Sequence, residues 1–467
     1  MTQHPEPAAE SLEQRVWDVI VVGAGPAGST AARRAAEGGA SVLLLDRAAF
    51  PRYKTCGGGL LGESLALLPD GARATVESRV RETVFTDRFR RRFVLRRPQP
   101  YLAMVRRAEF DQALASAAQD AGVRFADGVT VRSVAVSSTA ATPDDASAPP
   151  PPVSSTGAPL DDAVAPSPVA STGSVGASVP PVTLVTTAGT LRARVVIGAD
   201  GTGGRIGRYV GVQPGGVDLG LEDEVRMPDG AAAAAWRDRV LLDWGGSPGS
   251  YAWVFPKQDS LTIGVIQRKG APDETREYLA AWRRHLGLTE ADAETLHSSG
   301  HLTQWRRPGS PLRRGPVLVA GDAAGLLEPW TREGISFALR SGGWAGEAAA
   351  RAVAALGGSR PESTTHAHPA TGSTAESPPE SARAAFDAEL DTYRARVEAV
   401  LQPEQVAGAG ILSAFERHRG LVHTLLRTPF GARYFVRFCR GETTLARVAR
   451  HRSVQRAVRL LGASAAP

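Results

Sequence analysis

The sequence predicts an α/β protein with a second, sheet-based domain inserted into the first and a helical region at the C-terminus. Three observations lead to this prediction. Short apolar stretches alternate with helical ones along much of the 467-residue chain, which is typical of a largely parallel sheet covered by helices. Between about Val212 and Arg307, strand-like stretches follow one another instead. Beyond Arg417, the chain has the pattern of short amphipathic helices with arginine-rich polar faces.

The first elements are a strand, a helix and a second strand, "WDVIVVG", Pro26–Glu37 and "SVLLLD". Gly23, Gly25 and Gly28 lie between the strand and the helix with the spacing G-x-G-x-x-G. Such glycines allow a tight turn and the close approach of a pyrophosphate to the helix N-terminus. Asp46 ends the second strand, where a carboxylate can accept hydrogen bonds from ribose hydroxyls. The pattern predicts a dinucleotide site, for which NAD and FAD are both candidates.

Two low-complexity segments, 137–181 and 357–381, consist mainly of small and polar residues and proline. Neither has enough apolar residues to offset the entropy of ordering, so we expect a disordered insertion and a disordered linker. The stretches that flank the first segment, "VTVRSVAV" and "VTLVTTAG", have strand periodicity and could pair as a hairpin. His366 and His368 fall in the linker without further ligands, so we expect no metal site.

These patterns divide the chain into six parts. We expect a flexible tail (1–14), the first part of the dinucleotide domain (15–211), a substrate-binding sheet domain (212–309), the second part of the dinucleotide domain (310–356), the linker (357–381) and a basic helical region (382–467).

Composition and charge indicate where the protein works. The two cysteines, Cys56 and Cys439, suggest a reducing compartment, and no signal peptide or apolar run of membrane-spanning length is visible. Eleven arginines and one acidic residue lie between Arg417 and Arg459, although the whole chain carries a net charge of only +6. This end is either a solvated basic face or a surface for anionic membranes. Nucleic acid is not expected, because no recognisable binding module accompanies the charge.

The choice between NAD and FAD depends on two later stretches. "VLVAGDAAGLLEPWTREGISFALRSG" contains Asp322 after a strand and Gly334 and Ile335 at the start of a helix. It resembles the flavoprotein motif in which an aspartate holds the ribitol chain and the helix N-terminus faces the flavin. "VVIGADGTGGRIGRYVG", with Asp200, is similar to a third element of the same superfamily. Together the motifs favour FAD.

With these motifs, "FPRYKTCGGGLLGES", "RRAEFDQAL" and "YAWVFPK" make the chain resemble the geranylgeranyl reductase family over roughly Val16 to Ala350. The family includes reductases of digeranylgeranylglycerophospholipids and of menaquinone side chains. The resemblance implies an FAD-binding Rossmann-like domain of the aromatic-hydroxylase type and an FAD-dependent reductase that saturates isoprenoid C=C bonds. Arg332 departs from the family pattern, because a glycine often precedes Glu-Gly-Ile, and the shape of this loop is therefore in question.

The resemblance also implies a set of flavin contacts. Carried over by position, they fall on Gly23, Gly25, Gly28, Asp46, Cys56, Gly57, Gly59, Arg107, Asp322, Gly334 and Ile335.

The aromatic strand "YAWVFPK" is the candidate substrate site. Tyr251, Trp253 and Phe255 point to one face, because side chains alternate along a strand. They either line a tunnel for the prenyl chain or belong to an ordinary core. Lys257 either meets a polar head group at the tunnel mouth or is an exposed strand end.

Reduction of an isolated alkene requires a hydride and a proton. Cys56 is the first candidate for the proton donor, and its alternative role is to shape the loop. Lys54 and Tyr251 are further candidates. The three glycines after Cys56 are expected to let the flavin ring and a lipid chain come close to the backbone. The electron donor is expected to be NAD(P)H or a reduced carrier.

Two other functions are compatible with the motifs. One is an FAD-dependent aromatic monooxygenase, and the other is a non-catalytic flavoprotein at a membrane surface. Under the first interpretation, we expect a cytoplasmic protein, peripheral at the inner membrane face, with a prenyl lipid or quinone as substrate and an anionic membrane surface as partner.

Overall fold

The computed structural model describes residues 12–136, 179–357 and 380–451. Most of the predicted N-terminal tail, insertion and linker lie outside these residues, as does the chain after residue 451.

Within the described residues, the first sheet has eight strands, and its path β17-β18-β11-β1-β2-β8 is parallel from β18 to β8. β9 and β10 pair in antiparallel fashion, which confirms the hairpin predicted around the first low-complexity segment. The strands are β1 (Val16–Val22), β2 (Val42–Leu45), β8 (Arg124–Ala126), β9 (Val131–Val136), β10 (Val182–Thr186), β11 (Gly189–Gly198), β17 (Arg313–Arg314) and β18 (Val317–Val319).

Two helices, α1 (Pro26–Glu37) and α8 (Ile335–Ala355), pack on each other beside this sheet. A Cβ at Gly342 or Gly346 would lie 2.1 or 2.2 Å from a backbone oxygen of α1, so glycine is required for this close approach. α1 begins with Pro26, whose fixed φ suits the first helical turn. Two further helices of this part are α4 (Arg107–Asp120) and α5 (Arg205–Val210).

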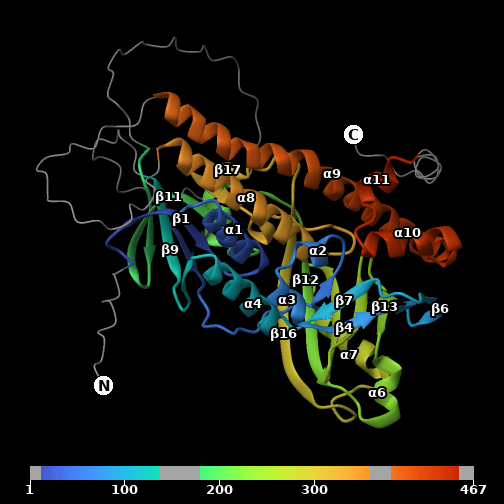
Figure 1. The fold of residues 1–467 in the computed structure, drawn as a ribbon. Coiled ribbons are helices and arrows are strands. Elements are labelled where there is room, and N and C mark those ends of the chain that lie inside the picture. Colours follow the sequence, from blue (N-terminus) through green and yellow to red (C-terminus); the bar gives the residue numbers. More distant parts are fainter. Residues whose placement is uncertain (1–11, 137–178, 358–379, 452–467) are drawn as a thin grey trace, which may run out of the picture.

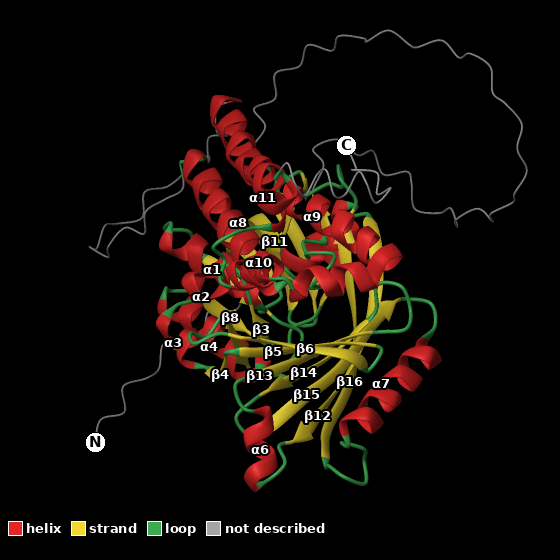
Figure 2. Cartoon of the chain, turned by 90° about the vertical axis from the view of Figure 1, so that its right-hand side faces the viewer, coloured by secondary structure: helices red, strands yellow, loops and turns green. Residues whose placement is uncertain are grey.

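The second sheet has seven strands in the described part of the chain, in the order β16-β12-β15-β14-β13-β5-β6. Figure 2 shows this sheet below α10, with α7 along one side and α6 at its lower end. Its elements are β5 (Glu82–Asp87), β6 (Arg90–Arg96), β12 (Pro214–Arg226), α6 (Gly230–Trp236), β13 (Arg239–Trp244), β14 (Tyr251–Pro256), β15 (Ser260–Arg268), α7 (Pro272–Leu286) and β16 (Thr295–Arg306).

The second sheet corrects one predicted boundary. β5 and β6 belong to the segment 15–211, which we assigned to the dinucleotide domain, yet β5 pairs with β13 of the inserted domain. Strand periodicity is a local property, whereas the choice of a pairing partner is not. A boundary at Val212 therefore leaves out two strands of the substrate-binding sheet.

A third, small sheet has three strands in the described part of the chain. Its strands β3 (Gly59–Leu60), β7 (Leu102–Val105) and β4 (Val76–Val80) pair in this order. The short helices α2 (Ser64–Leu67) and α3 (Asp70–Ala74) follow β3. β3 begins three residues after Cys56, so this sheet fixes one end of the glycine-rich loop.

Helices follow the last strand, in agreement with the predicted helical C-terminal region. They are α9 (Glu380–Arg427), α10 (Pro429–Cys439) and α11 (Leu445–Ala449), and a short η1 (Gly321–Ala324) precedes α8. α9 runs along the top of the molecule in Figure 1, from the first sheet to the second, and has non-helical backbone angles at His418. In the described part of the chain, no helix is long and apolar enough to cross a bilayer.

Candidate functional site

The glycine-rich turn after β1 has the geometry that a dinucleotide site needs. Gly23 has a φ of 101°, and a Cβ there would lie 2.3 Å from the Ala199 carbonyl oxygen. A Cβ at Gly28 would lie 1.7 Å from the Gly23 carbonyl oxygen. Asp46 accepts a hydrogen bond from the amide of Ala24 at 2.8 Å. The turn, the start of α1 and the carboxylate are therefore locked together.

Two arginines lie over this turn. Arg107 forms two hydrogen bonds to Asp111, at 2.9 and 2.8 Å, and Arg52 reaches the same carboxylate at 2.9 Å. Asp111 is fully buried. The guanidinium Nη2 atoms of Arg52 and Arg107 lie 3.7 and 4.0 Å from the position that a Cβ on Gly25 would take. Positive charge and the N-terminus of α1 thus converge where a pyrophosphate would sit.

Asp322 lies across the cavity from these arginines. Burial raises the pKa of its carboxyl, while the Lys54 and Arg107 cations lower it. No hydrogen bond to this carboxylate is found within the described residues, so its oxygens are available to hydroxyl groups of a ligand. The residues therefore fit FAD: the turn and arginines would hold its pyrophosphate, and Asp322 its ribitol chain.

The loop that carries Cys56 is held by the second sheet. Glu222 of β12 accepts hydrogen bonds from the Cys56 amide at 2.6 Å and from the Tyr53 hydroxyl at 3.0 Å. Lys257, at the end of β14, donates to the Gly57 carbonyl. The Thr55 hydroxyl donates to Ser299 of β16 at 2.9 Å. Three strands of one domain therefore position a loop of the other.

Packing within the protein explains two of the three glycines after Cys56. A Cβ at Gly57 would lie 2.5 Å from the Phe255 ring. Gly58 has a φ of 71°, and a Cβ there would lie 2.0 Å from the Val105 carbonyl oxygen. We expected these glycines to make room for ligands. In the structure, Gly57 and Gly58 first make room for the chain itself.

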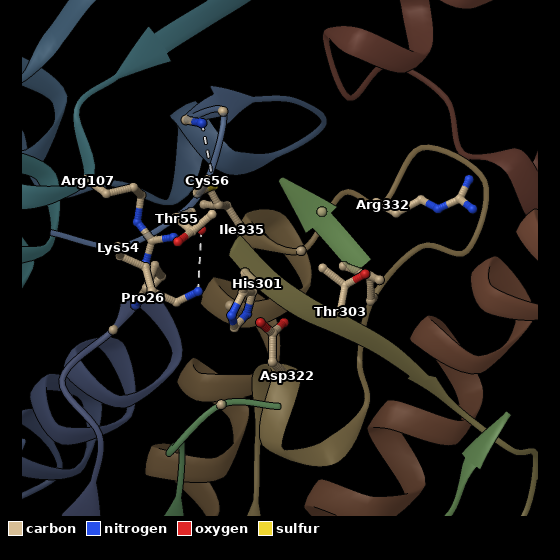
Figure 3. A pocket seen from close by; sticks show the side chains of 18 of the residues that line it. Pro26, Lys54, Thr55, Cys56, Arg107, His301, Thr303, Asp322, Arg332 and Ile335 are labelled. Atoms are coloured by element: carbon tan, nitrogen blue, oxygen red, sulfur yellow. Dashed lines mark hydrogen bonds between the residues drawn. The ribbon is translucent and has the colours of Figure 1, made fainter. Parts of the chain in front are cut away.

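The region beside Cys56 is positively charged. Burial and the neighbouring Arg107 cation lower the pKa of Lys54, although carboxylates nearby oppose them. His301 of β16 lies between Lys54 and Asp322 in Figure 3. Burial, followed by the Lys54 and Arg107 cations, lowers the pKa of His301 to about 3. His301 is therefore neutral at physiological pH, and its buried Nε2 atom has no hydrogen-bond partner among the residues that the structure describes.

A cavity of about 620 Å³ joins the dinucleotide turn, the Cys56 loop and the inner face of the second sheet. Tyr251, Trp253 and Phe255 form a row along one wall, with ring centroids 5.8 and 6.1 Å apart. The apolar lining is completed by Leu61, Leu102, Met104, Val240, Leu242, Trp244, Ile266, Leu327, Trp330 and Phe435. One cavity thus has a polar, cationic part and an apolar part.

Most predicted site residues meet in this cavity. Its lining includes Gly23, Gly25, Asp46, Lys54, Cys56, Gly57, Gly59, Arg107, Tyr251, Trp253, Phe255, Asp322, Gly334 and Ile335. Gly28 does not line it and instead packs on Gly23.

Two predicted residues have unexpected places. Lys257 is buried and does not line the cavity, so it is neither an exposed strand end nor placed to meet a head group. Tyr251 lines the cavity, but its hydroxyl donates to the Thr331 carbonyl at 2.8 Å, and burial raises its pKa. Tyr251 is therefore a poor proton donor.

Arg332, the departure from the family pattern, occupies a position that favours glycine. Its φ is 56°, in the left-handed region. The side chain donates to Asp218 of β12 at 2.9 Å, and this ion pair is almost completely buried. Figure 3 shows Arg332 directed away from Cys56. The loop therefore keeps a glycine-like backbone, and the large side chain is neutralised by a neighbouring strand.

Sequence reasoning missed Asp218 and Glu222. They lie four residues apart on β12, on the face that also carries Gly220, which lines the cavity together with Glu222. In the stretch "DLGLEDE", Leu219 and Leu221 alternate with Asp218, Gly220 and Glu222, as expected for a strand. Acidic residues within a predicted strand were the available signal, but their partners are far away in the sequence. His301 and Thr303 also line the cavity and carried no motif.

Family models match two parts of the chain. The model described as FAD dependent oxidoreductase matches residues 18–142, and the model described as FAD binding domain matches residues 176–342. Digeranylgeranylglycerophospholipid reductase 2 of Methanosphaera stadtmanae is 29% identical over 354 residues, which cover 72% of this chain and 78% of the relative.

Solved structures share the fold. A geranylgeranyl bacteriochlorophyll reductase-like protein from Thermoplasma acidophilum superposes with a TM-score of 0.64 at 18% identity, covering 96% of this chain and 99% of the other. A flavin-dependent brominase gives a TM-score of 0.63 at 18% identity, covering 96% and 100%. At this identity the likeness concerns architecture, which reductases and halogenating enzymes have in common.

Proposed function

Since the chain belongs to the geranylgeranyl reductase family of FAD-dependent oxidoreductases, we propose that it saturates carbon–carbon double bonds in the isoprenoid chain of a prenyl lipid. One observation carries the proposal: a single cavity is bounded by the dinucleotide turn, the Cys56 loop and the aromatic row of β14. An apolar chain lying along that row would reach the cationic part of the cavity.

The chain's own residues have three tasks in this reaction. FAD, when bound and reduced, supplies the hydride. Tyr251, Trp253 and Phe255 orient the alkene and exclude water from it. A proton must reach the other carbon, and Cys56 Sγ and Lys54 Nζ are two groups of the cavity that can hold it. The lowered pKa of Lys54 supports a role for its ammonium group in resupplying the proton that the reaction consumes.

The substrate is proposed to be a geranylgeranyl group or a menaquinone side chain. An apolar wall made of aromatic and aliphatic side chains supports a hydrocarbon ligand. Electrons are proposed to come from NAD(P)H or a reduced carrier. Because such substrates reside in bilayers, we propose that the protein works at the inner face of the cytoplasmic membrane.

Anaerobic single turnover tests this function. Reduced holoenzyme is mixed with a geranylgeranyl lipid or with menaquinone, flavin absorbance is followed, and products are analysed by mass spectrometry. The proposal expects flavin reoxidation together with a product that has gained two hydrogens, at one double bond, for each flavin reoxidised. Reoxidation only after oxygen is admitted, with hydroxylation of an added aromatic compound, would instead establish the monooxygenase.

A further inference from the structure

An arginine-rich hairpin lies beside the C-terminal helices. The six arginines between residues 88 and 97 surround the edge strand β6. Arg88, Arg90, Arg92 and Val94 are exposed there. The acids of the hairpin face inward instead: Asp87 is buried against Arg419 at 2.8 Å, and buried Glu82 is paired with Arg96 and Arg239. The hairpin therefore presents cations to solvent and hides its anions.

The corner between α9 and α10 has the same character. Leu425 and Phe430 are 50% and 55% exposed, and the exposed Arg427 and Arg433 lie beside them in sequence. The Phe430 ring packs on Tyr434 at 4.5 Å between centroids, so an aromatic pair is held at the surface. Exposed large apolar side chains among cations are typical of helices that lie in a lipid interface.

The hairpin and the corner are neighbours. His423 of α9 bonds the Arg91 carbonyl at 2.6 Å, and its ring packs against Phe93 at 4.9 Å. Arg440, after α10, donates to backbone carbonyls of residues 99 and 100. Figures 1 and 2 agree that β6 and α10 lie on the same side of the molecule. We call the exposed residues of this side the basic face: Arg88, Arg90, Arg92, Val94, Leu425, Arg427, Phe430 and Arg433.

The arginines of the basic face are available to bind an anionic partner. Within the ranges that the structure describes, these five arginines form no ion pair. An edge strand can carry cations simply to avoid pairing with other strands. That purpose does not require exposed Val94, Leu425 and Phe430, which a bilayer would cover. Nucleic acid would match the charge but not the apolar side chains.

The basic face lies directly outside the cavity. α10 carries Phe430 at its outer surface, and five residues later Phe435 lines the cavity with its ring 5.2 Å from Phe85 of β5. One helix, roughly 10 Å across with its side chains, thus separates the basic face from the apolar part of the cavity.

We propose that the basic face docks on the surface of an anionic bilayer and places α10 between the lipid headgroups and the cavity. This inference rests on the proposed function, because a prenyl lipid is what would have to pass from the bilayer into the cavity. It extends the membrane surface expected for the C-terminal region to the hairpin of β5 and β6. Arg452, Arg456 and Arg459, which contributed to that expectation, lie outside the described residues.

Vesicle binding by full-length holoprotein tests the docking. Vesicles of phosphatidylcholine and phosphatidylglycerol in a two-to-one ratio are compared with pure phosphatidylcholine at low salt. We expect R90Q/R92Q and R427Q/R433Q each to weaken binding to the anionic vesicles about tenfold or more, since each surface arginine contributes substantially near an anionic membrane. R124Q/R132Q, which removes two exposed arginines of the first sheet, is the matched control and should bind like wild type.

Three results would overturn the docking proposal. They are equal vesicle binding by all variants, an equal loss in the R124Q/R132Q control, and binding to RNA or DNA that the same substitutions abolish while vesicle binding persists. Truncation after Arg417 is not a substitute, because it removes α10 with the buried Val436 and Cys439.

A second measurement separates this inference from the proposed function. Reoxidation of reduced enzyme is followed with a short prenyl diphosphate in solution and with a prenyl lipid embedded in vesicles. R90Q/R92Q should match wild type with the soluble compound and be slower with the embedded lipid. If wild type reacts with neither, the proposed function fails, and the vesicle-binding result still decides whether the basic face docks.

Discussion

Cys56 is the residue at which proposed chemistry and loop packing meet. Its amide donates to Glu222, its sulfur accepts from the Gly58 amide at 3.4 Å, and it lines the cavity beside Lys54 and Arg107. Its backbone is therefore fixed by one domain, while its thiol faces the cavity. The two roles can be separated, because the backbone contacts do not depend on the side chain.

Substitution of Cys56 distinguishes these roles. If the thiol delivers the proton, Cys56→Ser should keep FAD binding and flavin reduction but slow reoxidation by the lipid about a hundredfold, because a hydroxyl is a weaker acid. If the residue only shapes the loop, serine should be tolerated, whereas Cys56→Val should impair flavin binding and substrate entry together. Anaerobic stopped-flow absorbance measures both steps. Wild-type reoxidation in the serine variant would remove Cys56 from the chemistry.

Glu222 gives the loop a dependence on pH. Burial, with a smaller contribution from Glu224, raises the pKa of Glu222 to about 7, although the Cys56 amide, Tyr53 and Lys257 oppose this. A carboxyl whose pKa is higher in the folded state binds a proton more readily there. Its contribution therefore makes the protein less stable as pH rises from about 4.5 to about 7.

Glu222→Gln should remove this dependence, because glutamine keeps an acceptor for the Cys56 and Tyr53 donors but does not titrate. At pH 8 we expect the variant to be more stable than wild type by up to roughly 3 kcal/mol. At pH 4 the two should be nearly equal. Urea unfolding at a series of pH values measures the difference, and parallel stability curves would show that Glu222 does not titrate as stated.

At the scale of elements, the loop between η1 and α8 contains an unfavourable backbone conformation at Arg332 that is offset by an ion pair. Arg332 has a left-handed backbone, which costs a residue with a side chain about 1–2 kcal/mol. Its guanidinium and Asp218 form a buried ion pair. The loop is further fixed by Glu328, which accepts hydrogen bonds from the Trp330 and Thr331 amides at 2.9 and 2.6 Å.

Arg332→Gly separates the two effects. Glycine relieves the backbone cost but leaves Asp218 buried without its cation, which costs about 3–5 kcal/mol. The variant should therefore lose roughly 2 kcal/mol of stability. Adding Asp218→Asn removes the uncompensated charge, so the double variant should recover much of that loss. Thermal unfolding of the four proteins in this cycle is the measurement, and additive effects would show that the two residues are not coupled.

Elements that follow from local patterns were predictable from the sequence. The turn of Gly23 and Gly25, the start of α8 at Ile335 and the hairpin of β9 and β10 each combine periodicity with glycine or proline signals. Pairings between distant segments were not. Nothing near Glu82 indicates that β5 joins β13, and nothing near Glu222 indicates that its partner is the Cys56 amide.

At the scale of the whole molecule, the cavity combines three segments that are far apart in sequence. The dinucleotide turn, the aromatic row and the stretch from Asp322 to Ile335 each carried a motif, so their residues could be named in advance. Phe435 and Trp330 had none, because an aromatic residue in a helix or loop is also an ordinary core residue. Site residues could therefore be predicted best in the segments where ligand binding requires a particular local backbone shape.

FAD binding should couple these segments energetically. Ligand that binds only the folded state raises the melting temperature with concentration. Asp322→Ala should weaken FAD binding roughly tenfold to a hundredfold, because a charged acceptor for hydroxyl groups is lost. The apo variant should be at least as stable as apo wild type, because burial raises the pKa of the Asp322 carboxyl and so disfavours the ionised group that alanine removes. Calorimetric titration and melting curves with added FAD test this, and equal FAD affinity in both proteins would contradict it.

The path of α9 determines which parts of the molecule can move. Before its break at His418, this helix is tied to the first sheet through the Tyr393 hydroxyl on the Val319 carbonyl at 2.6 Å, and to the second through Phe415 on Trp244 at 5.0 Å. Because α9 contacts both sheets, it restrains the distance between them. We therefore expect the two sheets to keep their spacing, and a bulky substrate to enter past the segment beyond the break, where Phe435 of α10 lines the cavity.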